Sequence, residues 1–249
     1  WIFSETKFVT GIPKELGGSG NPSPVTGYGV YMGIKASAKR AYGSDSLEGK
    51  RIAIQGAGSV ASHLAHYISK ENAKLFISDI FEDKAKQLAE ATGAEVVKPD
   101  DIYTLDVDIF SPCALGGVVN DDTINYLKCD ILAGGANNIL DHEEKHGNEL
   151  IKKGILYAPD YVINAGGLIN VASELEGYNE NLAMNKASRI YDTVLAIFDY
   201  AEENDIPTIA ASNALAEKRI EDVGKVGTIY SSKSHFSNRK GKQYLRDRF

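Results

Sequence analysis

The sequence predicts an α/β protein with a doubly wound parallel sheet, helices on both faces of that sheet and a helical C-terminal segment. Three observations carry this prediction. Short apolar runs alternate with helical patterns between residues 51 and 163, and this alternation is typical of a parallel sheet covered on both faces. A glycine turn at residues 56–61 joins the first apolar run to a helix. From residue 167 onward the pattern is helical.

Apolar residues at helical spacing, with glycines as stops, indicate the helices. Pro24 suits the first turn of a helix, and Gly43 ends that helix. The expected helices cover residues 24–42, a segment from 59, and residues 82–92, 121–127, 142–153, 168–176, 182–203 and 213–223. The expected strands are residues 51–54, 74–78, 95–97, 107–111, 131–133, 155–157 and 161–163.

The composition is that of an ordinary globular protein of 249 residues, with 43% hydrophobic and 24% charged residues. No run of about 18 apolar residues is present, so no membrane span is expected. Residues 1–7 lack the features of a signal peptide. The net charge of −7 disfavours general nucleic-acid binding. Cys113 and Cys129 lie in apolar surroundings, which favours free thiols in the cytoplasm over a disulfide.

The chain divides into three expected regions. Residues 1–23 contain glycines and prolines with little periodicity, as in a linker or the remnant of another domain. Residues 24–225 form the main domain, and residues 226–249 form a basic tail. From Lys233 to Phe249 six basic residues stand against one acid. A solvated or partner-docking terminus is favoured there over a polyanion-binding one.

Gly56, Gly58 and Ala61 form the pattern G-x-G-x-x-A, which is the dinucleotide-binding fingerprint of Rossmann-type domains. The first glycine permits a tight turn, the second lets the backbone approach a pyrophosphate, and the alanine keeps the helix close to the sheet. The N-terminus of the new helix then faces the phosphates. A glycine turn without a nucleotide is the alternative. The position between strand and helix disfavours that alternative.

A second strand ends at Asp79, 18 residues past Ala61, where a carboxylate is expected to accept hydrogen bonds from the ribose hydroxyls. Ile80 and Phe81 follow, and no arginine stands there to pair with a 2′-phosphate. NAD is therefore favoured over NADP. Because ligands bind past the carboxyl ends of parallel strands, four clusters should converge on one crevice: residues 56–61, 79, 111–117 and 134–138.

Further stretches carry a resemblance to a known family. Residues 19–26 (SGNPSPVT), 111–116 (SPCALG), 133–138 (AGGANN) and 158–167 (APDYVINAGG) resemble the amino acid dehydrogenases, in particular the leucine, valine and phenylalanine branch. Leucine dehydrogenases are the most similar. The similarity runs from about residue 6 to the tail. It implies reversible NAD-dependent oxidative deamination of a branched-chain aliphatic L-amino acid, of the leucine type, to a 2-oxo acid and ammonia. It also implies a homo-oligomer.

The resemblance also assigns roles to individual residues. It implies cofactor binding by Thr26, Gly56, Gly58, Ser59, Val60, Asp79, Ile80, Cys113, Ala114, Leu115, Asn137 and Asn138, and substrate binding by Thr10, Asn164, Leu168 and Val171. Leu168 and Val171 have a spacing that is equally typical of an ordinary core. Leu168 stands where the leucine enzymes usually carry valine, and this difference leaves the size of the substrate open. Gly27 and Gly135 stand where alanine and serine are commoner.

The family's catalytic residues have no counterpart in this chain. In the family, a glycine-rich N-terminal segment supplies two lysines and an aspartate, and no lysine here lies in a matching motif. We therefore assign no catalytic residue to this chain and expect those residues upstream of Trp1. The chain is interpreted as the cofactor half of the enzyme, and residues 1–23 and the tail are expected to lack packing partners. The alternative is a stand-alone NAD-binding module without catalysis.

Three other motifs could suggest metal binding or nucleophilic catalysis, but their surroundings in the sequence favour structural roles. His142 to His146 match H-E-x-x-H, the zinc pattern of metalloproteases, but residues 141–149 contain no apolar side chain to enclose a metal. A solvated helix start is expected instead. His63 and His66 have no acidic or cysteine neighbour and are expected to pack or lie at the surface. Cys113 has no adjacent base in sequence, so it is not expected to act as a nucleophile. No metal is expected.

Overall fold

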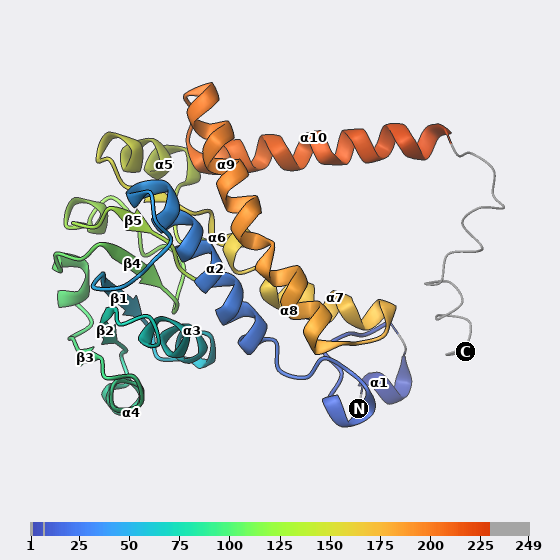
Figure 1. The fold of residues 1–249 in the computed structure, drawn as a ribbon, viewed down its shortest axis with the longest axis horizontal. Helices are drawn as coiled ribbons and strands as arrows, with labels where there is room; N and C mark the ends of the chain where they lie inside the picture. Colours follow the sequence, from blue (N-terminus) through green and yellow to red (C-terminus); the bar gives the residue numbers. More distant parts are fainter. Residues whose placement is uncertain (1, 7, 230–249) are drawn as a thin grey trace.

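The centre of the protein is a six-stranded sheet, seen in a computed structural model that describes residues 2–6 and 8–229 (Figure 1). The strand order is β3-β2-β1-β4-β5-β6, and every pair is parallel. The order changes direction between β1 and β4, which is the point where doubly wound sheets bind ligands. The predicted fold class is confirmed. The strands are β1 (Arg51–Gln55), β2 (Lys74–Ser78), β3 (Glu95–Val96), β4 (Ile109–Pro112), β5 (Ile131–Leu132) and β6 (Leu156–Tyr157).

Helices connect the strands and then continue to the end of the described chain. The α-helices are α1 (Ile2–Glu5), α2 (Ser23–Tyr42), α3 (Ser59–Ser69), α4 (Glu82–Thr92), α5 (Glu143–Lys152), α6 (Asp160–Ile163), α7 (Gly166–Ala172), α8 (Glu180–Ser188), α9 (Ile190–Asn204) and α10 (Thr208–Ile229). The 3₁₀ helices are η1 (Lys14–Leu16), η2 (Asp101–Thr104), η3 (Thr123–Asn125) and η4 (Ser173–Glu176). Figure 1 shows α10 extending beyond the other helices. Within the described residues no helix has the length and apolar character of a membrane span.

Alternating side chains of the strands build two cores, one on each face of the sheet. Ile52 and Ile54 of β1 point to one face, where α2, α3, α4 and α9 pack. Ala53 points to the other face, together with Phe76 and Phe110, and is covered there by η2, η3, α5 and the start of α10. Because successive strand residues face opposite sides, the two cores follow directly from the apolar runs in the sequence.

Two predicted elements were assigned the wrong type or length. Residues 161–163 were expected to be a strand, yet they belong to helix α6. A three-residue apolar run is ambiguous, and Pro159 with Asp160 begins a helix there. Residues 121–127 were expected to be helical, yet only the short η3 forms. The side chain of Asn120 accepts the N–H groups of Asp122 and Thr123, both at 3.1 Å, and this local turn replaces the start of a longer helix.

The C-terminal helices also differ from the prediction in their limits. The expected helix over residues 182–203 is two helices, α8 and α9. Arg189 donates its N–H to the carbonyl of Lys186 at 3.3 Å, and this tighter three-residue turn ends α8. The last helix, expected over residues 213–223, begins earlier at Thr208. The side-chain hydroxyl of Thr208 donates to the carbonyl of Tyr157 at 2.7 Å and so connects the start of α10 to β6.

The expectation that the N-terminal region lacks a packing partner is wrong for residues 11–19. Glu174 of η4 is only 3% exposed, and its carboxylate accepts three backbone N–H groups from this region. The donors are Gly11 and Ile12, both at 3.1 Å, and Ser19 at 2.6 Å. We call this arrangement the Glu174 clamp. Glu174 lies more than 150 positions from each of the three donors, so no local sequence pattern could predict the clamp. The tail beyond residue 229 lies outside the described residues.

Candidate functional site

The glycine turn after β1 has the geometry that its pattern predicts. Gly56 has a φ of +106°, and a Cβ on it would lie 3.1 Å from the Cβ of Ala114 and from the carbonyl oxygen of Cys113. Helix α3 begins at Ser59 after Gly58, which supplies no side-chain cap. The space around a Cβ on Gly58 is empty. Because no side chain caps α3 at Gly58, the first N–H groups of this helix stay available to an anion.

Asp79 lies at the end of β2 and holds this turn. One carboxylate oxygen accepts the N–H of Ala57 at 2.7 Å, and the other accepts the N–H of Phe81 at 2.8 Å. From the sequence, Asp79 was predicted to bind a ribose. In the structure its carboxylate also holds the backbone of the glycine turn. Each carboxylate oxygen has two lone pairs, so both oxygens can still accept a further hydrogen bond. The side chain is half-buried.

Two buried polar atoms next to the turn have no protein partner. They are Oε1 of Gln55 and Oγ of Ser78, among the described residues. These residues pair in register at the ends of β1 and β2, so their side chains share one face of the sheet. Buried polar atoms normally have a partner, and a polar ligand or water at this edge would supply one. Sequence reasoning missed both residues, although a polar residue ending an apolar strand was a readable signal.

Apolar side chains flank the same edge. Ile80, after β2, is 78% exposed, and Leu115, after β4, is 75% exposed. The two loops follow the strands on either side of β1, so their apolar side chains are available to contact a ligand that lies over the end of β1. Together with the glycine turn, the uncapped helix and Asp79, these residues fit the adenosine and pyrophosphate portions of a dinucleotide.

The loops after β4 and β5 meet in close backbone contact. A Cβ on Gly116 would lie 2.4 Å from the carbonyl oxygen of Asn137, and a Cβ on Gly134 would lie 2.1 Å from that of Pro112. Gly117 donates its N–H to the carbonyl of Asn138 at 2.7 Å. Asn138 itself has a φ of +54°, which an asparagine tolerates better than most residues. Together with the contacts at Gly56 and Asp79, these contacts bring the four strand-end clusters together at one edge of the sheet. That they line one crevice stays a prediction.

The amide of Asn164 joins this edge to helix α7. Its Nδ2 donates to Oδ1 of Asn137 at 2.7 Å, which brings a predicted substrate residue to a predicted cofactor residue. A Cβ on Gly167, at the start of α7, would lie 2.8 Å from Oγ1 of Thr26. Thr26 therefore adjoins the same helix from the side of α2. Thr10 is exposed beside Gly11, which the Glu174 clamp holds.

The two predicted pocket residues of α7 differ in exposure. Leu168 is 71% exposed, and Val171 is half-buried. The alternative that both side chains belong to an ordinary core is wrong for Leu168. Its side chain is free to contact a ligand or another protein surface.

Both cysteines are free thiols, as predicted. Cys113 is half-buried and its Sγ accepts the N–H of Gly135 at 3.4 Å. Burial raises the pKa of the Cys113 thiol, and burial raises the pKa of Cys129 to about 12. A thiol with a raised pKa is a poor nucleophile at neutral pH. The interpretation of Cys113 as part of the loop lining, without a nucleophilic role, is consistent with this environment.

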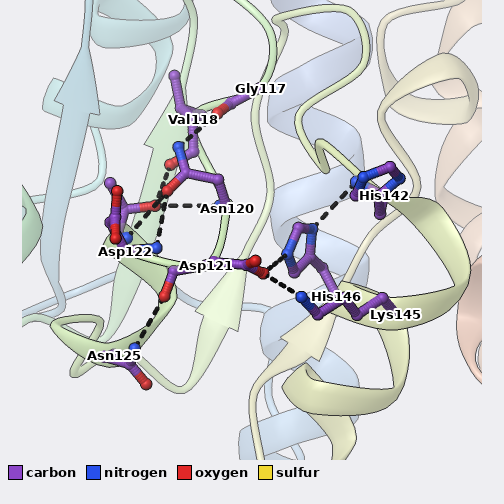
Figure 2. Close-up of polar contacts among 10 residues, drawn as sticks. Gly117, Val118, Asn120, Asp121, Asp122, Asn125, His142, Lys145 and His146 are labelled. Atoms are coloured by element: carbon purple, nitrogen blue, oxygen red, sulfur yellow. Dashed lines mark hydrogen bonds and ion pairs between the residues drawn. The ribbon is translucent and has the colours of Figure 1, made fainter.

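The H-E-x-x-H segment forms the first turn of α5, but the expectation of a solvated start is wrong at its last residue. His146 is completely buried. Its Nε2 contacts Oδ1 of Asp121 at 3.0 Å, and its Nδ1 accepts the N–H of His142 at 3.0 Å (Figure 2). Asp121, from the loop before η3, also pairs with Lys145 at 2.5 Å. Within the described part of the chain, no three His, Cys, Asp or Glu residues are grouped to hold a metal.

The contacts of Asp121 with Lys145 and His146 should make the free energy of unfolding depend on pH in the acid range. Hydrogen bonds from Lys145 and His146 lower the pKa of Asp121 to about 2. The unfolded chain binds this proton more readily, so these contacts stabilise the fold above about pH 4 and lose their contribution towards pH 2. We expect Asp121→Asn to lower the midpoint of urea unfolding at pH 5, with a smaller difference from wild type at pH 3. An equal or larger difference at pH 3 would contradict this assignment.

Comparison with known proteins now decides the family. A family model described as glutamate/leucine/phenylalanine/valine dehydrogenase matches residues 17–81 and 77–226. The chain belongs to this dehydrogenase family. The leucine dehydrogenase of Thermoactinomyces intermedius is 53% identical over 92% of this chain and 62% of its own length. That of Geobacillus stearothermophilus is 51% identical over 94% of this chain and 64% of its length.

Solved structures of enzymes with different substrates in their names have the same fold as this chain. The crystal structure of L-tryptophan dehydrogenase from Nostoc punctiforme matches with a TM-score of 0.79 and 49% identity, over 81% of this chain and 61% of the other. A hetero-hexameric glutamate dehydrogenase from Thermus thermophilus matches with a TM-score of 0.69 and 24% identity, over 86% of this chain and 56% of the other, and so shows the fold alone. The chain spans less than two thirds of these relatives.

Proposed function

We propose that this chain is the cofactor-binding part of an NAD-dependent dehydrogenase that oxidatively deaminates a branched-chain aliphatic L-amino acid of the leucine type. The observation that carries the cofactor assignment is the hydrogen bond of 2.7 Å between Asp79 and Ala57. It joins the carboxylate after β2 to the glycine turn after β1, and β1 is one of the two strands that border the switch point between β1 and β4. Family membership supports the reaction class.

Different residues at the strand ends would bind different portions of the cofactor. The N–H groups at the start of α3, from Ser59 and Val60 after Gly58, would hold the pyrophosphate. Asp79 would accept the hydroxyls of the adenosine ribose, with Ile80 and the loop residues Cys113, Ala114 and Leu115 along the cofactor. Asn137 and Asn138, with Thr26, would contact the nicotinamide riboside. Bound NAD supplies the hydride acceptor for the reaction.

NAD is proposed over NADP on electrostatic grounds. The Asp79 carboxylate would lie where NADP carries its 2′-phosphate, and two negative charges at contact distance repel each other. The two residues that follow, Ile80 and Phe81, bring no positive charge to that position.

The leucine-type substrate is proposed from the α7 segment. Asn164 and Thr10 would lie by the polar part of the amino acid, and Leu168 and Val171 would contact its side chain. Burying each CH₂ of an apolar substrate contributes about 0.8 kcal/mol, which favours aliphatic side chains in such a pocket. Relatives named for tryptophan and phenylalanine are 48% and 47% identical. A substrate panel of leucine, valine, phenylalanine and tryptophan therefore tests this part of the proposal.

The isolated chain should bind NAD but produce no NADH from leucine. NAD binding follows from the strand-end site, whereas deamination needs a base of tuned pKa in the cleft, and no residue of this chain is assigned that role. Isothermal titration calorimetry measures the first, and absorbance of NADH with excess leucine measures the second. Failure to bind NAD would overturn the cofactor assignment. Turnover by this chain alone would show that the catalytic residues had been misplaced.

The coding sequence upstream of Trp1 separates the enzyme from the stand-alone NAD-binding module. A glycine-rich segment with two lysines and an aspartate supports the dehydrogenase, and the longer protein should then form NADH from leucine. A start codon close to Trp1 supports the module. Homo-oligomeric assembly stays a prediction of the family resemblance, and sedimentation of the longer protein tests it. A cytoplasmic location stays a prediction drawn from the two cysteines.

A further inference from the structure

Asp160 is a buried carboxylate beside the proposed cofactor site to which no role has been assigned so far. It is the first residue of α6 and only 4% exposed. One oxygen accepts the N–H of Ile139 at 2.7 Å, and the other accepts the N–H of Tyr161 at 2.6 Å. Burial raises the pKa of the Asp160 carboxyl, and hydrogen bonds from the backbone N–H groups of Ile139, Tyr161 and Asn138 offset part of this rise. No cation pairs with it among the described residues. The carboxylate is thus satisfied by backbone alone.

These bonds link two segments that meet at the nicotinamide end of the proposed site. Ile139 directly follows Asn137 and Asn138 in the loop after β5. Asn164 closes the turn of α6 by donating its N–H to the carbonyl of Asp160 at 2.8 Å. Its side chain then donates to Asn137 at 2.7 Å. Asp160 therefore holds the loop after β5 with its side chain, and its backbone carbonyl positions Asn164 on the opposite side.

The loop has an uncommon backbone conformation at Asn138. Its φ of +54° lies in the left-handed region, which asparagine adopts more readily than most residues but which is kept only where the surrounding structure supports it. Charge-assisted hydrogen bonds to a carboxylate are roughly twice as strong as neutral ones. The Asp160 carboxylate is therefore well suited to keep the loop in this conformation.

We propose that Asp160 is a positioning residue that aligns Asn137 and Asn138 with Asn164 and so selects for the nicotinamide riboside portion of NAD. The proposal rests on the NAD-binding function proposed above. It assigns Asp160 no contact with the cofactor. The adenosine and pyrophosphate portions are bound at β1, β2 and α3, and their binding is independent of Asp160.

Comparing NAD with ADP tests this selectivity, because ADP keeps the adenosine and both phosphates and lacks the nicotinamide riboside. Asp160→Asn preserves the shape, but its amide N–H₂ group would face a backbone N–H that the carboxylate oxygen now accepts. We expect calorimetry to show NAD affinity about tenfold weaker in this variant, with ADP affinity changed less than about twofold. Equal losses for NAD and ADP, or no loss for either, would overturn the proposal.

A matched control separates positioning from loss of stability. Asp108 is also a partly buried carboxylate that accepts a backbone N–H, from Arg51 at 2.7 Å, but it lies at the opposite end of the sheet. Asp108→Asn should lower the midpoint of thermal unfolding without changing the ratio of NAD to ADP affinity. If the wild-type chain binds neither ligand, the proposed function fails, and that outcome differs from an unselective loss in the Asp160 variant.

Hydrogen exchange on the wild-type chain gives a test that needs no variant to fold. NAD should slow exchange of the backbone N–H groups of residues 137–139 beyond the protection that the Asp160 bonds already give, whereas ADP should leave them unchanged. Equal protection by the two ligands would contradict the assignment of this loop to the nicotinamide riboside.

Discussion

Replacing Asp79 by alanine should weaken NAD binding at least tenfold. The variant removes two proposed charge-assisted hydrogen bonds to the ribose, each contributing about 1.5–3 kcal/mol, and every 1.4 kcal/mol is about a factor of ten in affinity. It also frees the N–H groups of Ala57 and Phe81, which the carboxylate now accepts at 2.7 and 2.8 Å. The glycine turn would then be less well held before the cofactor binds. Isothermal titration calorimetry with NAD measures the loss.

Asp83 provides the control for charge alone. It lies four residues further on in the first turn of α4 and is exposed, so Asp83→Ala removes the same charge without touching the turn. NAD affinity should change less than about twofold in this control. NADP offers a second check, since removing the Asp79 carboxylate should narrow the preference for NAD. Wild-type affinity in Asp79→Ala would show that this carboxylate contacts neither ribose nor a turn that matters for binding.

Replacing Glu174 by alanine should destabilise the fold by roughly 3–5 kcal/mol, because up to three backbone N–H groups lose their acceptor and each buried, unsatisfied donor costs about 1–3 kcal/mol. Two of the donors, Ile12 and Ser19, are themselves buried at 2% and 1% exposure. The stability of Glu174→Gln should lie between that of the wild type and that of Glu174→Ala. Its single acceptor oxygen can serve Ile12 and Ser19 but not Gly11. Chemical denaturation with the free energy extrapolated to water measures these differences.

Glu176 is the matched control for Glu174, two residues away in the same 3₁₀ helix. Its side chain is 67% exposed and pairs with Lys186 at 3.0 Å, and an exposed ion pair contributes at most about 1 kcal/mol. Glu176→Ala should therefore have little effect. If Glu174→Ala proved no more destabilising than Glu176→Ala, the clamp would have no net role in stability.

Local pattern determined what could be predicted from the sequence. The strand–turn–helix at Gly56 and the carboxylate at Asp79 are short-range features, because the chemistry and the spacing that produce them lie within one βαβ unit. The alternation of apolar runs similarly determines the sheet and its two cores. Short apolar segments such as residues 161–163 carry too few residues to separate strand from helix, and there the prediction was wrong.

Contacts between distant residues account for most of the remainder. Asp160 binds a backbone N–H 21 positions away and Glu174 binds three that are 155 to 163 positions away. Asp160 lies in the family-like stretch 158–167, but nothing in that stretch shows that its carboxylate is buried. Glu174 lies outside every stretch that carried the resemblance. His146 shows the same limit, since the Asp121 carboxylate that it contacts lies 25 positions earlier. Three-dimensional structure was needed to find these residues.

The two strands that border the sheet have a consequence for how the protein behaves in concentrated solution. β3 and β6 are each only two residues long. Unpaired N–H and C=O groups on an outer strand are a template on which other chains add by β-pairing, and very short outer strands offer little of it. We therefore expect little edge-to-edge aggregation despite the apolar strands. Any stable contact between copies would then use side-chain surfaces, which are more selective than backbone pairing.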